Sequence, residues 1–325
     1  MSDAPYDAVL LDLDGTVYHG SQVIDGAADA VATVRKQGTA VRFVTNNASK
    51  APSAVAQHLR DLGLAAETDE VHTSAQAAAA LLRDRLPQGA RVLVVGTASL
   101  GDEIVAVGLE PVRTADDTVS AVVQGHSPET GWADLAEASV AIRAGARWVA
   151  TNVDTTLPSE RGLLPGNGSM VGALRIATGA EPIVAGKPQP LLFETAARAA
   201  NADRPLVVGD RLDTDIAGAV AAGLDVLCVL TGVATPHTIL TAGKAERPTH
   251  LSADITALSE AVDELRVGPR PGWEIGEGDV LTVRGEGDRL DLLRALCDAA
   301  WRTGVTRVRA DGDAAEAAVT GLGLA

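Results

Sequence analysis

Short apolar runs recur along the chain, and each ends in a polar cluster or a glycine. The run at 8–11 leads directly into Asp12 and Asp14, and the run at 40–44 leads into Thr45. Runs of this kind predict strands that are buried on both faces. Helical patterns over 27–37 and 51–62 follow these runs, and a glycine closes each pattern. The alternation predicts a doubly wound parallel α/β sheet.

The same pattern continues to the end of the chain. Further strands are predicted at 91–96, 119–124, 146–150, 205–208 and 225–230. Helices are predicted at 132–144, 171–178, 191–200, 216–222 and 255–265. The segment 157–169 is rich in Pro and Gly and is predicted to be a loop, and 266–272 a linker. Beyond the linker, strands at 280–283 and 305–308 with helices at 290–301 and 314–320 predict a small α/β module.

Composition narrows the class of protein. The 325 residues carry a formal net charge of -16 with no basic stripe to offset it, which argues against a nucleic-acid partner. Charged residues and glycines interrupt every long apolar stretch, so no membrane span is expected, and the first residues lack a signal-peptide pattern. Cys228 and Cys297 lie in or near apolar segments. They are predicted to be buried thiols, which suits a reducing, cytoplasmic location.

Polar groups follow several of the predicted strands and apolar loops. They are Asp12 with Asp14, then Thr45, then Lys187, then Asp210 with Asp215. The carboxyl ends of parallel strands meet at the edge of the sheet where ligands bind, so we expect these groups to gather there. Each one alone is compatible with a helix cap, a turn acid or a loop lysine. Their occurrence together, in this order, favours a site.

The acids of this set suit phosphoryl transfer assisted by a metal ion. Asp12, Asp210 and the backbone carbonyl of Asp14 offer hard oxygens to one Mg²⁺, which would also relieve the repulsion between close carboxylates. Asp12 is predicted to be the nucleophile that forms an aspartyl-phosphate and splits hydrolysis into two steps. Asp14 is predicted to protonate the leaving oxygen and then to take a proton from water.

The remaining groups suit the phosphate itself. The Thr45 hydroxyl, with Asn46 next to it, and the Lys187 ammonium are predicted to bind the phosphoryl oxygens. Asp215 is predicted to lie outside the direct metal ligands and to hold Lys187 in place. Lysine is scarce in this chain, which strengthens the assignment of the one that follows an apolar segment.

At this point the chain resembles a known family. The segments Asp-Leu-Asp-Gly-Thr-Val (12–17), Val-Thr-Asn-Asn (44–47), Gly-Lys-Pro (186–188) and Gly-Asp-Arg-Leu-Asp-Thr-Asp (209–215) are similar to the signatures of the haloacid dehalogenase superfamily. The resemblance spans residues 7–265. The acid at Asp14 resembles the phosphatase members, whereas the dehalogenase members lack it. The resemblance therefore implies a Mg²⁺-dependent phosphoric monoester hydrolase.

The inserted α/β series resembles the large, type 2 cap of this family. The segment 151–154 and the loop after it are similar to the branch of para-nitrophenylphosphatases, glycerol-phosphate and phosphoglycolate phosphatases. By that resemblance the cap closes over a small phosphorylated metabolite, and Asn152, Asp154 and Arg161 select its leaving group; ordinary turn chemistry explains these three residues equally well. The branch also contains nucleotide and pyridoxal-phosphate phosphatases, but the cap has few aromatic residues to stack on a base or pyridine ring. We therefore expect a small polyol or acid phosphate, and the resemblance implies glycerol phosphate or phosphoglycolate.

The expected domains are a Rossmann-like phosphatase core (1–77 and 183–265), the cap (78–182) and the C-terminal module (272–325). The loop at 283–287 faintly resembles the pyrophosphate loop of N-acetyltransferases, which would make the module a partial fold of that kind. Its spacing differs from that family, and Glu286 and Asp288 would repel a pyrophosphate. A structural or dimer-forming appendage is the favoured interpretation.

Other classes remain open at this stage. A phosphosugar mutase or phosphotransferase on the same fold would pass the phosphate from the aspartate to a sugar hydroxyl. A receiver-type switch also uses acids, Thr and Lys around Mg²⁺, but it carries its acid pair and its phosphorylated Asp on different strands and lacks a cap. The paired acids after the first strand, at Asp12 and Asp14, favour the phosphatase. The sequence leaves a homodimer open.

Overall fold

The computed structural model describes residues 6–159, 161–259 and 261–325. The chain divides into two compact units. The first unit comprises Met1–Arg42, Leu62–Ala65 and Ala197–Ala325, and the second comprises Phe43–Asp61 and Ala66–Ala196.

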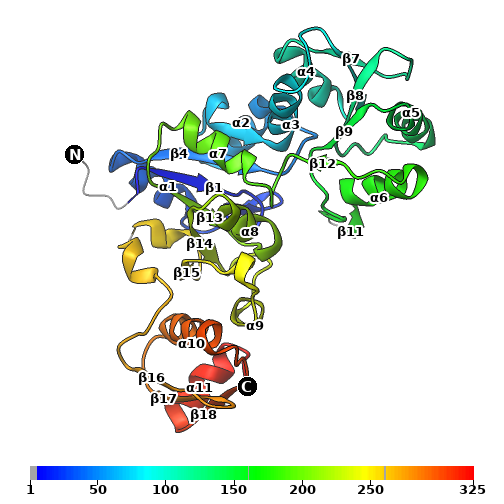
Figure 1. The fold of residues 1–325 in the computed structure, drawn as a ribbon. Helices are drawn as coiled ribbons and strands as arrows, with labels where there is room; N and C mark the ends of the chain where they lie inside the picture. Colours follow the sequence, from blue (N-terminus) through cyan, green and yellow to red (C-terminus); the bar gives the residue numbers. More distant parts are fainter. Residues whose placement is uncertain (1–5, 160, 260) are drawn as a thin grey trace. The chain divides into compact units, whose positions relative to one another are not determined.

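A six-stranded sheet has the order β15-β14-β13-β1-β4-β5 (Figure 1). Its strands are β1 (Ala8–Leu11), β4 (Ala40–Thr45), β5 (Val71–Thr73), β13 (Pro205–Gly209), β14 (Asp225–Val229) and β15 (His250–Ser252). β13 pairs in parallel with β1 and with β14, and β14 in turn with β15. Every residue of β1 and β13 is buried, as expected for strands covered on both faces. The predicted doubly wound α/β fold is confirmed.

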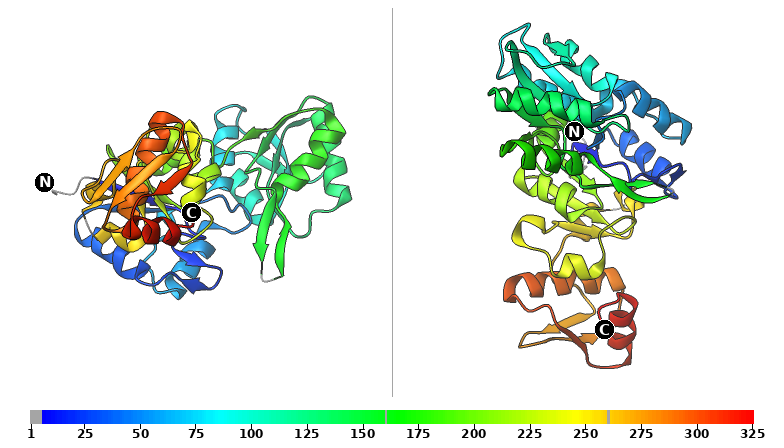
Figure 2. Two further views of the ribbon diagram at one scale, coloured as in Figure 1. Left: turned by 90° about the horizontal axis from the view of Figure 1, so that it is seen from below. Right: turned by 90° about the vertical axis from the view of Figure 1, so that its right-hand side faces the viewer.

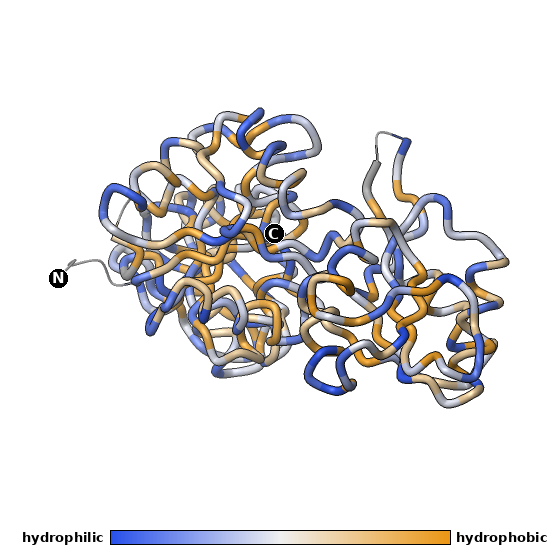
Figure 3. Tube along the Cα trace, turned by 90° about the horizontal axis from the view of Figure 1, so that it is seen from above, coloured by the Kyte–Doolittle hydropathy of each residue, from blue (hydrophilic) through white to orange (hydrophobic). Residues whose placement is uncertain are grey.

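Helices connect these strands as the sequence predicts. They are α1 (Ala27–Lys36), α2 (Pro52–Asp61), α3 (Ser74–Arg83), α7 (Leu191–Ala199) and α8 (Ala217–Ala221), with a π-type turn η2 (Leu212–Ile216) before α8. Smaller elements are the hairpin β2 (Tyr18–His19) and β3 (Gln22–Val23), the helix α9 (Pro236–Leu240) and the 3₁₀ turns η1 (Thr68–Glu70) and η3 (Lys244–Glu246). Figure 3 shows that hydrophobic and hydrophilic stretches alternate along the chain.

A second parallel sheet lies within the second unit, in the order β12-β9-β8-β6-β7. Its strands are β6 (Arg91–Val95), β7 (Glu110–Val112), β8 (Val119–Gln124), β9 (Arg147–Ala150) and β12 (Ile183–Val184). The helices α4 (Ala98–Ala106), α5 (Trp132–Arg143) and α6 (Asn167–Thr178) belong to the same segment. Leu93, Val122, Trp148 and Leu174 pack in one hydrophobic core between strands and helices.

The structure corrects three predictions of secondary structure. The predicted loop 157–169 contains a hairpin of β10 (Thr156–Ser159) and β11 (Gly162–Pro165), and α6 begins before its end. The predicted helix 255–265 consists, where the structure describes it, of two 3₁₀ turns, η4 (Ile255–Ser259) and η5 (Val262–Leu265). The predicted strand 305–308 is displaced toward the C-terminus, to β18 (Val308–Ala310).

The C-terminal module is a three-stranded sheet with two helices, and it belongs to the first unit. β16 (Trp273–Gly276) runs antiparallel to β17 (Leu281–Gly285), and β17 pairs in parallel with β18. The helices are α10 (Arg289–Thr303) and α11 (Asp313–Gly321). Figures 1 and 2 show α10 between this sheet and α9. Among the described residues, no helix is long and apolar enough to span a membrane.

Both cysteines are free and buried, as predicted. Burial raises the pKa of the Cys297 thiol far above its ordinary value. We expect neither thiol to react with a thiol-specific chromogenic reagent at pH 8 in the native protein, because the reactive thiolate is scarce and out of reach. Both should react within seconds after unfolding in guanidinium chloride. Rapid modification of the folded protein would contradict this burial.

Candidate active site

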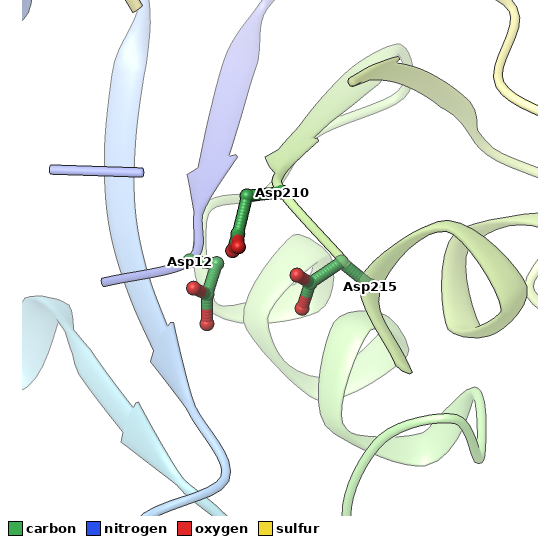
Figure 4. A group of neighbouring side chains, drawn as sticks. All are labelled: Asp12, Asp210 and Asp215. Carbon is green, nitrogen blue, oxygen red and sulfur yellow. The ribbon is translucent and has the colours of Figure 1, made fainter. Parts of the chain in front are cut away.

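Three carboxylates gather at the carboxyl ends of β1 and β13. Asp12 follows β1, Asp210 follows β13, and Asp215 lies in the π-type turn η2 (Figure 4). One carboxylate oxygen from each lies within 4.8 Å of the others. The exposed fractions of Asp12, Asp210 and Asp215 are 9%, 1% and 1%. Close, buried carboxylates repel each other strongly, so this cluster favours a cation or a shared proton.

Glycines leave room for the acid side chains. A Cβ atom on Gly15 would lie 2.5 Å from Asp210 Oδ2, and one on Gly232 would lie 1.9 Å from the same oxygen. A Cβ atom on Gly209 would lie 2.3 Å from that of Asp215. Gly15 also has a φ of 90°, a conformation that favours glycine. A larger residue at any of these positions would displace an acid.

Backbone N–H groups orient Asp210 and Asp215. Val233 N donates to Asp210 Oδ2 at 2.8 Å, and Ala234 N donates to the Asp210 carbonyl at 2.8 Å. Arg211 N donates to Asp215 Oδ2 at 3.1 Å. These hydrogen bonds fix the orientation of the two carboxylates.

The segment from Asp12 to Tyr18 turns back on itself. Asp12 N donates to Val208 O at 2.9 Å and so extends the pairing of β1 with β13. Gly15 N donates to Tyr18 O at 2.8 Å, and Asp14 forms a bridge with Tyr18. The Asp14 side chain is exposed and is not among the three clustered carboxylates. This is compatible with the prediction that its carbonyl meets the metal while its carboxyl group serves as acid and base.

A buried thiol lies next to the acids. Burial, followed by the charges of Asp210 and Asp215, raises the pKa of the Cys228 thiol well above its ordinary value. Cys228 lies in β14 and is fully buried. The thiol is therefore neutral at physiological pH and contributes no charge to the cluster.

The second unit holds the other predicted site residues, and Lys187 is buried among them. Its exposed fraction is 2%, Nζ donates to Val44 O at 3.1 Å, and Nζ lies 5.6 Å from the centre of the Phe193 ring. Thr45 ends β4 and is buried, and its Oγ1 accepts from Asn47 N at 3.1 Å. A buried ammonium and a buried hydroxyl at the ends of apolar segments are groups that can bind a phosphate.

Asn46 connects Lys187 with the loop after β9. Its Oδ1 accepts from Lys187 N at 2.8 Å, and its Nδ2 donates to Lys187 O at 3.1 Å and to Asp154 Oδ2 at 3.3 Å. Its carbonyl accepts from Asn152 Nδ2 at 2.8 Å and from Ser74 Oγ at 2.6 Å. The structure therefore brings Asn152 and Asp154 to the same place as Asn46 and Lys187.

Arg161 is the third predicted selectivity residue. It is exposed, in the turn between β10 and β11. Sequence reasoning missed the segment after β14, whose backbone holds Asp210 and whose Thr231 Oγ1 donates to Gly15 O at 2.6 Å. The signal was present, because Thr231 and Gly232 follow an apolar run in the same way as the other polar strand ends.

The donor set fits a small hard cation. Carboxylate oxygens are the ligands that Mg²⁺ and Ca²⁺ prefer, and the acid cluster supplies three of them in a buried space. The set contains no thiolate or imidazole, which would favour softer metals.

The parallel sheet and the acid cluster define a haloacid dehalogenase-like hydrolase. The family model described as haloacid dehalogenase-like hydrolase matches residues 9–110, and a related hydrolase model matches 184–258. The chain is 51% identical over 306 residues to D-glycerol 3-phosphate phosphatase of Mycobacterium tuberculosis, covering 91% of this chain and 86% of the relative. The chain belongs to this family, and it is a phosphatase.

Other relatives and solved structures agree. Acid sugar phosphatase of Staphylococcus saprophyticus is 38% identical over 262 residues, 80% of this chain and 98% of the relative. The crystal structure of a glycerol phosphate phosphatase from M. tuberculosis in complex with magnesium superposes with a TM-score of 0.95 at 51% identity, covering 98% of both chains. The crystal structure of the 4-nitrophenylphosphatase of Thermotoga maritima superposes with a TM-score of 0.72 at 29% identity, covering 79% of this chain and 97% of that chain.

The C-terminal module matches a different family. Residues 270–324 match a model described as a GCN5-related N-acetyltransferase like domain. This match covers the segment for which the sequence showed only a faint resemblance to the same fold.

Asn46 offers a direct test of the connection between Lys187 and the loop. In Asn46→Asp, a second carboxylate would face Asp154 and the carbonyl of Lys187, and the amide donor would be lost. We expect kcat/KM to fall about 100-fold, the cost of losing a half-buried hydrogen-bond donor and gaining a repulsion between carboxylates. The matched control is Asn47→Asp, since Asn47 is exposed and its Oδ1 only accepts, from Ser49 N and Oγ. Equal activity of the two variants would contradict this role of Asn46.

Proposed function

We propose that this phosphatase hydrolyses a small phosphate monoester in a reaction that requires Mg²⁺. Glycerol phosphate is the favoured substrate, and phosphoglycolate is the alternative. The cluster of Asp12, Asp210 and Asp215 carries the proposal, because three buried carboxylates within 4.8 Å suit a divalent cation. The identity of 51% to a glycerol phosphate phosphatase supports the choice of substrate.

The acids have separate roles in this proposal. Asp12 attacks the phosphorus, and the ester oxygen leaves with a proton from Asp14. Asp14 then takes a proton from water, which attacks the aspartyl-phosphate and frees phosphate and Asp12. Asp12, Asp210 and the Asp14 carbonyl would hold Mg²⁺, with Asp215 beside them. When bound, the ion supplies positive charge that offsets the charge of the phosphate and the nucleophile.

Two further groups bind the phosphate in this proposal. The Lys187 ammonium and the Thr45 hydroxyl bind the phosphoryl oxygens that the metal does not contact. Asn46 holds the backbone of Lys187 through two hydrogen bonds. The burial of Lys187 at 2% exposure supports this role, because a desolvated ammonium attracts an anion more strongly than one in water.

Each predicted domain has its own role in this proposal. Residues 1–77 and 183–265 form the phosphatase core, 78–182 the cap, and 272–325 the C-terminal module. Asn152 and Asp154, held at Asn46, and the exposed Arg161 of the β10–β11 hairpin select the leaving group. Hydrogen-bonding groups of this kind suit the hydroxyls of glycerol.

The net negative charge, the exposed apolar side chains and the free thiols support a proposal for the partners and the location of the enzyme. We propose a cytoplasmic enzyme with no nucleic-acid or membrane partner, acting as a homodimer. Trp132 and Ile176, on the helices α5 and α6, are 84% and 90% exposed, and large apolar side chains in such positions suit a protein contact. The molar mass in solution, measured by light scattering, tests the dimer, and a Trp132→Glu variant should be a monomer.

The test of the function is a phosphate-release assay across glycerol phosphates, phosphoglycolate, sugar phosphates, nucleotides, pyridoxal phosphate and para-nitrophenyl phosphate, with and without Mg²⁺. We expect Mg²⁺-dependent release with the highest kcat/KM on a glycerol phosphate. A folded, metal-loaded protein that released no phosphate, but transferred it to an added sugar, would instead be a phosphotransferase.

A further inference from the structure

The C-terminal module does not fit the acyl-CoA that its family resemblance implies. A CoA pyrophosphate would need free backbone N–H groups at the start of α10. Those of Leu290 and Asp291 already donate to Asp288 Oδ1, at 2.9 and 3.1 Å. Trp273 Nε1 donates to Asp288 O at 2.9 Å, and a Cβ atom on Gly287 would lie 3.1 Å from that nitrogen. The loop is filled by the protein's own side chains.

A buried arginine of α10 forms hydrogen bonds with the phosphatase sheet. Arg294 is 5% exposed, and its Nε and Nη2 both donate to Leu251 O in β15, at 3.1 and 2.6 Å. Its Nη1 donates to Asp291 Oδ1 at 2.7 Å. A buried guanidinium is costly unless it is hydrogen-bonded, and here each of its three nitrogens donates to a strand carbonyl or a carboxylate. The module is therefore fixed to the edge strand of the sheet.

A second contact joins the C-terminal end of α10 to α9. Trp301 Nε1 donates to Ile239 O at 3.3 Å. Arg247 lies over the Trp301 ring, 5.5 Å from its centre, and its Nη1 donates to Trp301 O at 3.3 Å. The Trp301 hydrogen bond holds α9 against the module. Arg247, which follows η3 and also donates to Ala242 O, adds a cation over the indole face.

Both contacts border the segment that holds Asp210. This support segment, residues 230–235, lies between the end of β14 and the start of α9. Its first residue, Leu230, donates to Ala253 O at 3.0 Å, just after β15. Its Val233 and Ala234 N–H groups donate to the side chain and the carbonyl of Asp210. The support segment is thus held at one end beside the strand that Arg294 binds and at the other by the helix that Trp301 binds.

We propose that α10 positions Asp210 for metal binding by holding both ends of the support segment, and that the module binds no acyl-CoA. Arg294 and Trp301 are positioning residues, since they act through the backbone of residues 230–235. This inference rests on the proposed function, in which Asp210 holds Mg²⁺.

The test compares variants of the full chain by calorimetric titration with Mg²⁺ alone, by melting temperature and by kinetics. Arg294→Met keeps the length of the side chain but removes its donors, and Trp301→Phe keeps a ring below Arg247 but removes the indole N–H. We expect each to raise the Kd for Mg²⁺ about five- to tenfold, near the lower end of what losing an outer metal contact costs. The substrate KM at saturating Mg²⁺ should be unchanged.

The control is Arg302→Met on the same helix, because Arg302 is exposed and pairs only with Glu277 and Asp298 in the ion pairs of the described chain. It should bind Mg²⁺ like the wild type. Variants that melt earlier but keep the wild-type Kd would overturn the proposal, as would titration of the wild type with acetyl-CoA that showed binding. If Arg294→Met fails to fold, Arg294→Lys and Trp301→Phe decide the outcome. A wild type that binds no Mg²⁺ would overturn the proposed function itself.

Discussion

Asp12→Asn is expected to reduce kcat by about 10⁴-fold or more, which is the cost of removing a covalent nucleophile, the role proposed for Asp12. An amide oxygen attacks phosphorus poorly, whereas the other carboxylates of the cluster belong to different elements and cannot replace Asp12. The fold should survive, because Asp12 contributes its backbone N–H to the sheet and Asn keeps that bond. Steady-state phosphate release and circular dichroism measure the two effects.

The matched control is Asp213→Asn, in the same turn as Asp215. Asp213 is exposed, and its carboxylate pairs with Arg211. Exposed pairs of this kind contribute little, so this variant should retain activity within about twofold. An Asp12→Asn enzyme with wild-type turnover would exclude Asp12 as the nucleophile.

Asp210→Asn is expected to lower activity about 1000-fold at a fixed Mg²⁺ concentration, because several kcal/mol of charge stabilisation depend on the ion that Asp210 is proposed to hold. The side chain should stay in place, since an amide oxygen can still accept from Val233 N. Chelation of the wild type with EDTA should abolish activity, and added Mg²⁺ should restore it.

The melting temperature of Asp210→Asn separates the effect of carboxylate repulsion from the effect of metal binding. Without metal, it should melt at a higher temperature than the wild type, because one of three close carboxylate charges is gone. Mg²⁺ at a hundredfold excess over Kd should raise the melting temperature of the wild type by roughly 4 °C and that of the variant far less. If Mg²⁺ shifted both equally, Asp210 would not be a metal ligand.

The sequence predicted the strands that carry the acids because each reads as an apolar run with an abrupt polar end. β1 and β13 are buried throughout, so their composition leaves little choice of structure. The acid cluster was predictable for a related reason. Parallel strands bring their carboxyl ends together, so Asp12 and Asp210 meet although the chain separates them widely.

Other parts depend on contacts that local pattern does not report. In β10, Pro158 lies opposite Leu163, and a proline in a strand reads as a loop from the sequence. The helical pattern over 255–265 breaks into 3₁₀ turns, since the tertiary contacts of η4 with α1 outweigh its weak helical preference. Asn46 and Val233 act through hydrogen bonds that involve backbone carbonyls and N–H groups. Every residue except proline carries these groups, so the sequence does not show which of them form such bonds.

The most direct test of the central claim is to trap the covalent intermediate. The enzyme would be acid-quenched during turnover of glycerol phosphate with Mg²⁺, digested, and analysed by mass spectrometry. We expect a phosphoryl group on the peptide that contains Asp12, lost on treatment with hydroxylamine and absent in Asp12→Asn. A phosphoryl group on another residue, or none during active turnover, would contradict it.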